Sequence, residues 1–202
     1  MSGTMTTEIT CFKAYDIRGR VPDQLNEDIA YRIGRAYAAL LSPERVVVGF
    51  DIRLTSEALC TAVSRGLMDG GADVLNIGQC GTEEVYFATS HVNADGGIAV
   101  TASHNPKDYN GMKLVRKNSR PISADTGLFD IKKLAELSQF PKPEKVGVLE
   151  IVNTKPAYIE HLLTYVNASL LKPLKIVCNA GYGGAGPAID LLEPHLPFEL
   201  IK

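Results

Sequence analysis

A polar loop behind an apolar strand carries the residue types best suited to chemistry in this chain. Residues 97–101 read Gly-Ile-Ala-Val-Thr, and Ser103, His104 and Asn105 follow before Pro106. A serine hydroxyl is a nucleophile, while histidine and asparagine side chains can donate hydrogen bonds to an anion. Open α/β sheets bind ligands at the carboxyl ends of their strands, which is where this loop would lie. On spacing alone, an ordinary Ser-Asn-Pro turn is an equal alternative.

The same loop argues against a serine hydrolase or phosphatase. Neighbouring side chains tend to point apart, so His104 is poorly placed as the base for Ser103. No Gly-x-Ser-x-Gly elbow is present either. A nucleotide site is a second alternative, because the glycines of residues 181–186 match the Gly-x-Gly-x-x-Gly spacing and Glu199 follows as an acidic residue.

Alternating strand and helix patterns indicate the elements that must position this loop. Helical spacing follows an N-cap at Asn26, and short apolar runs of buried-strand type recur between the helices. Strands separated by helices imply crossover connections, so we expect a mixed, mostly parallel sheet with helices on both faces. The Asn110-Gly111 dipeptide predicts a tight turn before an antiparallel strand. The expected helices are 25–40, 56–69, 82–88, 128–137, 158–165 and 187–192, and the expected strands are 45–50, 73–77, 97–101, 112–115, 174–178 and 198–201.

Composition narrows the class of protein. The 202 residues include 21 Lys and Arg against 23 Asp and Glu, a formal charge of −2, which argues against a nucleic-acid binder. No apolar run approaches the roughly 18 residues of a membrane span, and the start of the chain lacks a signal-peptide pattern, so we expect a cytoplasmic protein. The cysteines are irregularly spaced and predict buried, reduced thiols, and no spacing of cysteines and histidines indicates a metal site. These cysteines are Cys11, Cys60, Cys80 and Cys178.

Several segments together resemble one family. Thr101-Ala-Ser-His-Asn-Pro106 resembles the active-site phosphoserine loop of the α-D-phosphohexomutases, the phosphoglucomutase/phosphomannomutase superfamily. Phe12–Gly19, Asp51-Ile-Arg53 and Asp108–Lys113 match further family segments in the same order. Gly78–Tyr86 is similar to the bacterial phosphomannomutase branch that serves GDP-mannose and surface-polysaccharide synthesis.

The resemblance implies an activity and a domain order. It implies interconversion of mannose 6-phosphate and mannose 1-phosphate through a phosphoserine and a hexose 1,6-bisphosphate. Phosphoglucomutase or dual specificity, and a non-catalytic phosphosugar- or nucleotide-binding domain, are alternatives. We expect a disordered or non-native start at 1–10, the phosphoserine domain I at 11–139, a linker at 140–155 and the opening of a second α/β domain at 156–202.

By family position, the resemblance also assigns roles to single residues. Ser103 is the residue that carries the phosphate and, through it, contacts Mg²⁺. Arg18 and Lys113 neutralise charge and exchange a proton with the sugar, and His104 donates to the phosphate or sugar. Tyr15 lines the substrate cleft. Asn105 is assigned to substrate binding, and we expect it mainly to hold the shape of the loop.

Other family parts have no counterpart in these residues. The Asp-x-Asp-x-Asp-Arg metal loop, the sugar-recognition loop and the carboxy-terminal phosphate-binding loop are all missing. One serine oxygen does not make a specific Mg²⁺ site. We therefore expect the metal to be bound by the longer parent protein, together with the missing domains, and this chain alone to be inactive. Asp51 and Arg53 look like a structural pair, and Asp16 an anchor for the amino-terminal loop.

Overall fold

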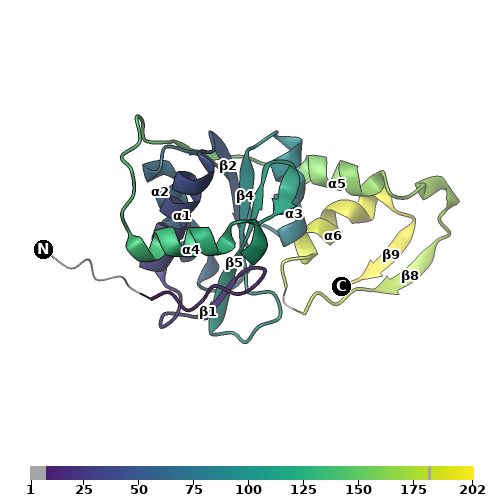
Figure 1. The fold of residues 1–202 in the computed structure, drawn as a ribbon. Helices are drawn as coiled ribbons and strands as arrows, with labels where there is room; N and C mark the ends of the chain where they lie inside the picture. The colour runs from purple at the N-terminus through teal and green to yellow at the C-terminus, as the bar shows by residue number, and fades with distance from the viewer. Residues whose placement is uncertain (1–7, 182) are drawn as a thin grey trace, which may run out of the picture.

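A seven-stranded sheet forms the centre of the computed structural model, which describes residues 8–181 and 183–202 (Figure 1). Its strands are β1 (Ile17–Arg20), β2 (Arg45–Phe50), β3 (Asp73–Gln79), β4 (Gly96–Val100), β5 (Tyr109–Arg116), β6 (Arg120–Pro121) and β7 (Leu149–Ile151). The order across the sheet is β1-β5-β4-β2-β3-β7, with β6 paired to β5. Among the described strands of this sheet, β5 alone runs against the others. The expected mixed, mostly parallel sheet is confirmed.

Helices cover both faces of this sheet, as expected. One face packs against α1 (Glu27–Leu41), α2 (Ser56–Asp69) and α4 (Leu128–Leu137), and the other against α3 (Thr82–His91) (Figure 1). Alternate residues of β2 divide between the two cores: Val46 and Val48 join the first, Val47 the second. The Asn26 side chain caps α1 by accepting from the Ile29 N–H. Short 3₁₀ helices lie at Lys117–Ser119, Ala124–Thr126, Ala168–Leu170 and Glu193–His195.

The turn predicted at Asn110-Gly111 is wrong, because both residues lie inside β5. The Asn110 side chain is buried and bonds across to the start of α2, so it is not free to shape a turn. Gly111 pairs with Arg18 of β1, and a Cβ there would lie only 1.9 Å from the carbonyl oxygen of Ile17. The dipeptide therefore serves close strand contact, and the chain reverses earlier, in residues 101–108.

Two expected boundaries also differ from the structure. Disorder through residue 10 is wrong for Ile9, which is buried in the core and donates its N–H to Glu136, while residues 1–7 lie outside the described residues. The segment 140–155, expected to be a linker, carries β7, which pairs with β3. The side chains of β7 are exposed although Leu149 and Ile151 are apolar, and main-chain pairing with β3 holds the strand in the sheet.

The carboxy-terminal part forms a second, smaller α/β unit with its own two-stranded sheet. It consists of α5 (Lys155–Leu163), β8 (Leu174–Val177), α6 (Gly186–Leu192) and β9 (Phe198–Ile201), with β8 and β9 parallel. The helix α5 packs on α3. The centroid of the Phe87 ring of α3 lies 5.4 Å from the ring centroid of Tyr158 and 5.0 Å from the ring centroid of His161. Lys155 of α5 reaches the buried carboxylate of Glu84 at 2.7 Å. This ion pair and the rings join the two units.

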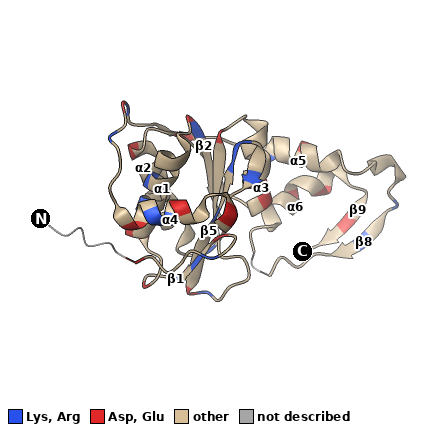
Figure 2. Ribbon diagram, in the orientation of Figure 1, with Lys and Arg blue, Asp and Glu red and all other residues tan. Residues whose placement is uncertain are grey.

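Charge and cysteine usage agree with the composition. Lys, Arg, Asp and Glu are interspersed over both units (Figure 2). No described helix has both the length and the apolar character needed to span a bilayer. All four cysteines are free, and Cys178 is half-buried while the other three are buried. The expectation of reduced thiols is therefore confirmed, and that of burial holds for three of them.

Candidate active site

Ser103 stands exposed at the carboxyl end of β4 in a backbone conformation that is uncommon for serine. Its φ is +52°, in the left-handed region, which costs an L-residue without glycine's freedom roughly 1–2 kcal/mol. Its N–H donates to Thr101 Oγ1 at 2.9 Å. Such strain persists only where the surroundings determine the conformation. The loop is therefore held in place with its hydroxyl in solvent.

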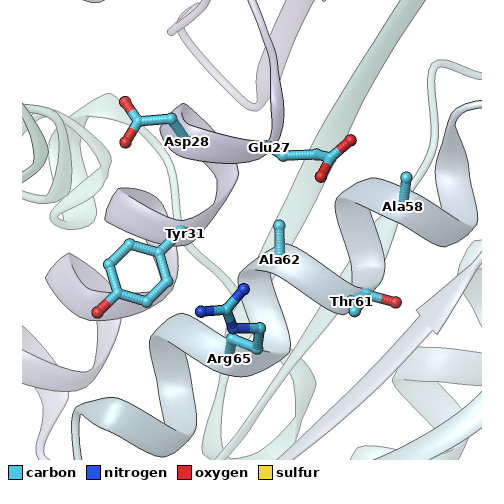
Figure 3. Close-up of a pocket in the computed structure, with 7 residues that line it drawn as sticks. All are labelled: Glu27, Asp28, Tyr31, Ala58, Thr61, Ala62 and Arg65. Atoms are coloured by element: carbon cyan, nitrogen blue, oxygen red, sulfur yellow. The ribbon is translucent and has the colours of Figure 1, made fainter.

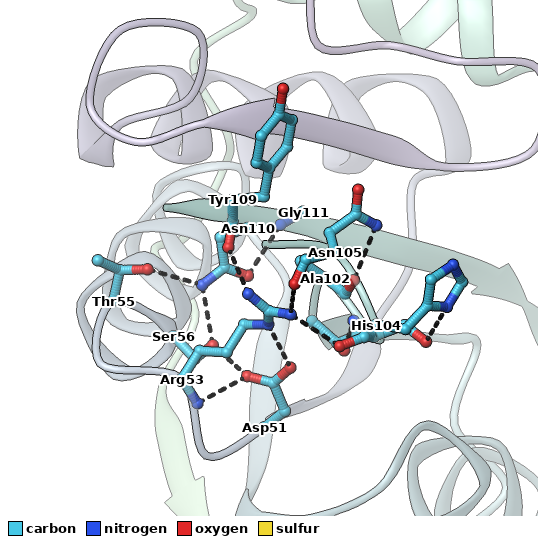
Figure 4. A network of polar contacts seen from close by, with 12 residues as sticks. Asp51, Arg53, Thr55, Ser56, Ala102, His104, Asn105, Tyr109, Asn110 and Gly111 are labelled. Atoms are coloured by element: carbon cyan, nitrogen blue, oxygen red, sulfur yellow. Dashed lines mark hydrogen bonds and ion pairs between the residues drawn. The ribbon is translucent and has the colours of Figure 1, made fainter. Parts of the chain in front are cut away.

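Arg53 supplies most of that restraint. Its Nη2 donates to the carbonyl oxygens of Ser103 at 2.7 Å and Asn105 at 2.5 Å, and its Nη1 to those of Pro106 at 2.7 Å and Tyr109 at 3.0 Å (Figure 4). The serine loop, residues 101–109, thus wraps around one guanidinium. β2 and β4 are parallel neighbours, so the residues that follow them emerge at the same edge of the sheet.

A polar network below Arg53 fixes the guanidinium in turn. The expected pair is confirmed, with Asp51 Oδ2 at 3.6 Å from Arg53 Nε. The other carboxylate oxygen of Asp51 accepts from the Ser56 hydroxyl at 2.5 Å. Buried Asn110 donates to the hydroxyls of Ser56 and Thr55 at 2.9 and 2.8 Å (Figure 4). The network connects β2, the start of α2 and the start of β5 under the loop.

Arg18 and Lys113 share one carboxylate. Asp16 Oδ2 lies 3.0 Å from Arg18 Nη2 and 3.2 Å from Lys113 Nζ. Arg18 Nη1 also donates to the carbonyl oxygen of Thr101, two residues before Ser103. Burial lowers the pKa of the Arg18 guanidinium, the Asp16 carboxylate opposes that shift, and the nearby Arg53 charge adds to it. Two cations against one anion leave the cluster one positive charge beside the serine loop.

The remaining predicted residues differ in their placement. His104 is exposed, and its Nδ1 lies 3.4 Å from Ser103 Oγ, so the two side chains do not point apart as expected, although the contact is long for a hydrogen bond. Asn105 Nδ2 donates to the Ala102 carbonyl at 2.9 Å and so holds the loop from within. The Tyr15 side chain is 78% exposed, before β1, and faces solvent.

A cleft of about 530 Å³ opens between the serine loop and the glycine-rich segment of the second unit. Ser103, Arg53 and Lys107 line one side, and Gly181, Gly183 and Gly184 the other. Glu199, the acidic residue of the nucleotide alternative, forms an ion pair with Lys175 at 2.8 Å. On the serine side of the cleft, Arg53 and Lys107 outweigh the single carboxylate of Asp51, so this side carries net positive charge.

A smaller hollow of about 290 Å³ lies between α1 and α2 (Figure 3). Charged side chains of both signs line it, and none of the predicted site residues does. Its lining consists of Glu27, Asp28, Tyr31, Ala58, Thr61, Ala62 and Arg65. This hollow brings no reactive group together with the serine loop, so the cleft beside Ser103 is the candidate site.

The described residues do not fit a magnesium site. Within residues 8–181 and 183–202, no three histidine, cysteine, aspartate or glutamate side chains gather closely enough to hold a metal ion. Two carboxylates beside the serine loop, Asp16 and Asp51, are each engaged by arginine.

Sequence reasoning did not find two features of this site. It took Arg53 as the partner of Asp51 and missed its bonds to four carbonyls of the serine loop. It gave Asp16 no role beyond anchoring, whereas this carboxylate joins Arg18 to Lys113. Residues that follow neighbouring parallel strands meet at one edge, and that rule could have placed Arg53 beside Ser103.

Comparisons with known proteins identify the family. Residues 10–141 match the model described as phosphoglucomutase/phosphomannomutase, alpha/beta/alpha domain I. A phosphomannomutase of Salmonella typhimurium is 58% identical over 203 residues, covering 97% of this chain and 44% of the relative. A Xanthomonas campestris protein named phosphohexose mutases is 58% identical over 194 residues, covering 96% of this chain and 43% of its own length.

A solved structure supports the same assignment. A phosphoglucomutase/phosphomannomutase family protein from Burkholderia thailandensis has a TM-score of 0.86 at 34% identity, over 98% of this chain and 44% of that one. The chain thus spans less than half the length of the relatives named here. Because the family model matches more than half of the chain, and the fold agrees, the chain belongs to the phosphoglucomutase/phosphomannomutase family.

Proposed function

We propose that the protein acts as a phosphomannomutase-type isomerase in the form of its longer parent. It interconverts mannose 6-phosphate and mannose 1-phosphate, the latter serving GDP-mannose synthesis in the cytoplasm. Ser103 carries a phosphoryl group and passes it to the sugar, which yields a hexose 1,6-bisphosphate, and the serine then takes the other phosphate back. The relatives' names support this reading, since several are phosphomannomutases.

The observation that carries the proposal is the setting of Ser103. Its hydroxyl is exposed in a cleft, on a loop that Arg53 restrains and that Arg18 contacts at Thr101. Phosphoryl transfer requires positioning and stabilisation of negative charge more than covalent help from the protein. A phosphoserine brings ~1.5 to 2 negative charges, and the cations Arg18, Arg53 and Lys107 lie at or beside the loop that would carry it.

Each predicted site residue has a part in this proposal. Arg18 and Lys113, held by Asp16, stabilise charge at the transferring group, and Lys113 can exchange a proton with a sugar hydroxyl. His104 donates to the phosphate or the sugar. Asn105 holds the loop on its substrate side, and Tyr15 is free to contact sugar that enters from solvent. The Mg²⁺ expected for the family belongs to the parent, whose further residues would supply its ligands.

Intact-mass measurement on the full-length parent tests the phosphoserine. Incubation with a hexose 1,6-bisphosphate should leave one phosphate on the wild type and none on Ser103→Ala. Ser138→Ala is the matched control, because Ser138 also has a left-handed backbone, with φ +50°, but ends α4. No phosphate on the wild type would instead favour a domain that only binds phosphosugars. Assays with mannose and glucose phosphates then decide between a phosphomannomutase and a dual-specificity enzyme.

A further inference from the structure

We infer that Arg53 is a positioning residue for phosphoryl transfer at Ser103, and that it acts by turning the peptide groups of the serine loop. This inference rests on the proposed function and assigns the guanidinium a role beyond pairing with Asp51. Arg53 is set back under the loop and reaches Ser103 only through its backbone carbonyl, so it is not itself a catalytic residue.

Arg53 fixes the direction of two peptide groups of the serine loop. The carbonyl oxygens of Ser103 and Pro106 both point at Arg53. A trans peptide is planar, and its N–H points opposite to its C=O. The N–H groups of His104 and Lys107 therefore point away from the guanidinium, toward the open side of the loop.

These two N–H groups are available to bind an anion. Among the hydrogen bonds of residues 8–181 and 183–202, neither the His104 nor the Lys107 N–H donates to a protein acceptor. A backbone N–H that has no protein acceptor and points to the open side of a loop can donate to an anion. A phosphoryl group on Ser103 lies next to the His104 N–H in sequence and gains a preorganised donor.

The shape of the loop requires the planar, forked guanidinium of an arginine. Arg53 is largely buried, with 15% of its side chain exposed, and one guanidinium serves four carbonyls through two nitrogens while Asp51 holds Nε. Lysine supplies the same charge from a single point and cannot span these positions. The fork, together with the bond from the Ser103 N–H to Thr101, holds Ser103 in its left-handed conformation and directs the N–H groups of His104 and Lys107 outward.

The test compares Arg53→Met and Arg53→Lys with wild type in the full-length parent. The readouts are the rate at which Ser103 takes up phosphate from a hexose 1,6-bisphosphate, and kcat and KM of the mutase reaction. We expect kcat to fall about 100-fold in Arg53→Met and at least about tenfold in Arg53→Lys, because a misplacement near 1 Å has effects of this size. KM should stay within about threefold, since the Arg53 guanidinium is bonded to the loop carbonyls and to Asp51.

Arg32→Met is the matched control. Arg32 pairs with Asp28 at 2.7 Å on the surface of α1, away from the serine loop, and its loss should leave both rates unchanged. If Arg53→Met does not fold, Arg53→Lys carries the test alone. Arg53→Lys with a wild-type phosphorylation rate and kcat overturns the inference and leaves the proposed function standing. Wild-type protein that takes up no phosphate overturns both.

Discussion

Replacing Gly111 by alanine tests whether the spacing of β1 and β5 sets the position of Arg18. Gly111 is buried opposite Arg18 in the antiparallel pair, and its carbonyl accepts from the Thr101 N–H at 2.9 Å. An added Cβ would lie 1.9 Å from the carbonyl oxygen of Ile17 and 2.8 Å from Arg18 Nη1. The closest of these neighbours is backbone, which cannot rotate away as a flexible side chain does.

The size of the effect follows from that contact. β1 must move by at least about 1.1 Å to bring the closest approach from 1.9 to 3.0 Å, below which real Cβ contacts essentially do not occur. Overpacking of this kind costs about 1–3 kcal/mol of stability. Arg18 is carried on the strand that moves, and a misplacement near 1 Å can reduce turnover about 100-fold.

The assay measures kcat and Tm of full-length Gly111→Ala beside Gly186→Ala. A Cβ on Gly186, the first residue of α6, meets no atom within 4 Å, so this control should keep both values. A lower Tm together with a kcat loss near 100-fold is the result expected if the spacing of β1 and β5 positions Arg18. A Gly111→Ala protein with wild-type Tm and kcat would show that the strand spacing does not position Arg18. Lower Tm with full kcat would confine the spacing to a structural role.

Two further predictions concern charge and pH. Asp16→Asn removes the carboxylate shared by Arg18 and Lys113, so we expect the free energy of unfolding to fall by about 1–3 kcal/mol and kcat to be lower. Denaturant titration measures the first and the mutase assay the second. Unchanged values would mean that the two cations need no common anchor. Burial raises the pKa of the Cys60 thiol from 9.0 to about 12, so the unfolded chain ionises from about pH 9 while the folded thiol stays protonated. The stabilising contribution of the protonated thiol is therefore full below pH 9 and is lost as pH rises toward 12. Between pH 8 and pH 10, the free energy of unfolding should decrease less steeply for Cys60→Ala than for wild type.

Local patterns in the sequence determined most elements of this fold. Residues 45–50 form a strand and residues 128–137 a helix as expected, because the period of apolar residues is a property of neighbours along the chain. The same reasoning placed Ser103 at the carboxyl end of a strand, since an apolar run passed directly into a polar loop. The family motifs added the expectation that Arg18 and Lys113 belong to the site.

Tertiary structure decided what the local pattern could not express. Whether Asn110-Gly111 bends or runs straight depends on Thr55, Ser56 and the approach of β1, all distant in sequence. β7 exists because β3 offers a main-chain edge, although its own side chains are exposed. Arg53 lies 50 residues before Ser103, and only the parallel pairing of β2 with β4 brings its guanidinium under the serine loop. Pairing between distant strands is a property of the folded chain, which is why sequence spacing alone did not reveal it.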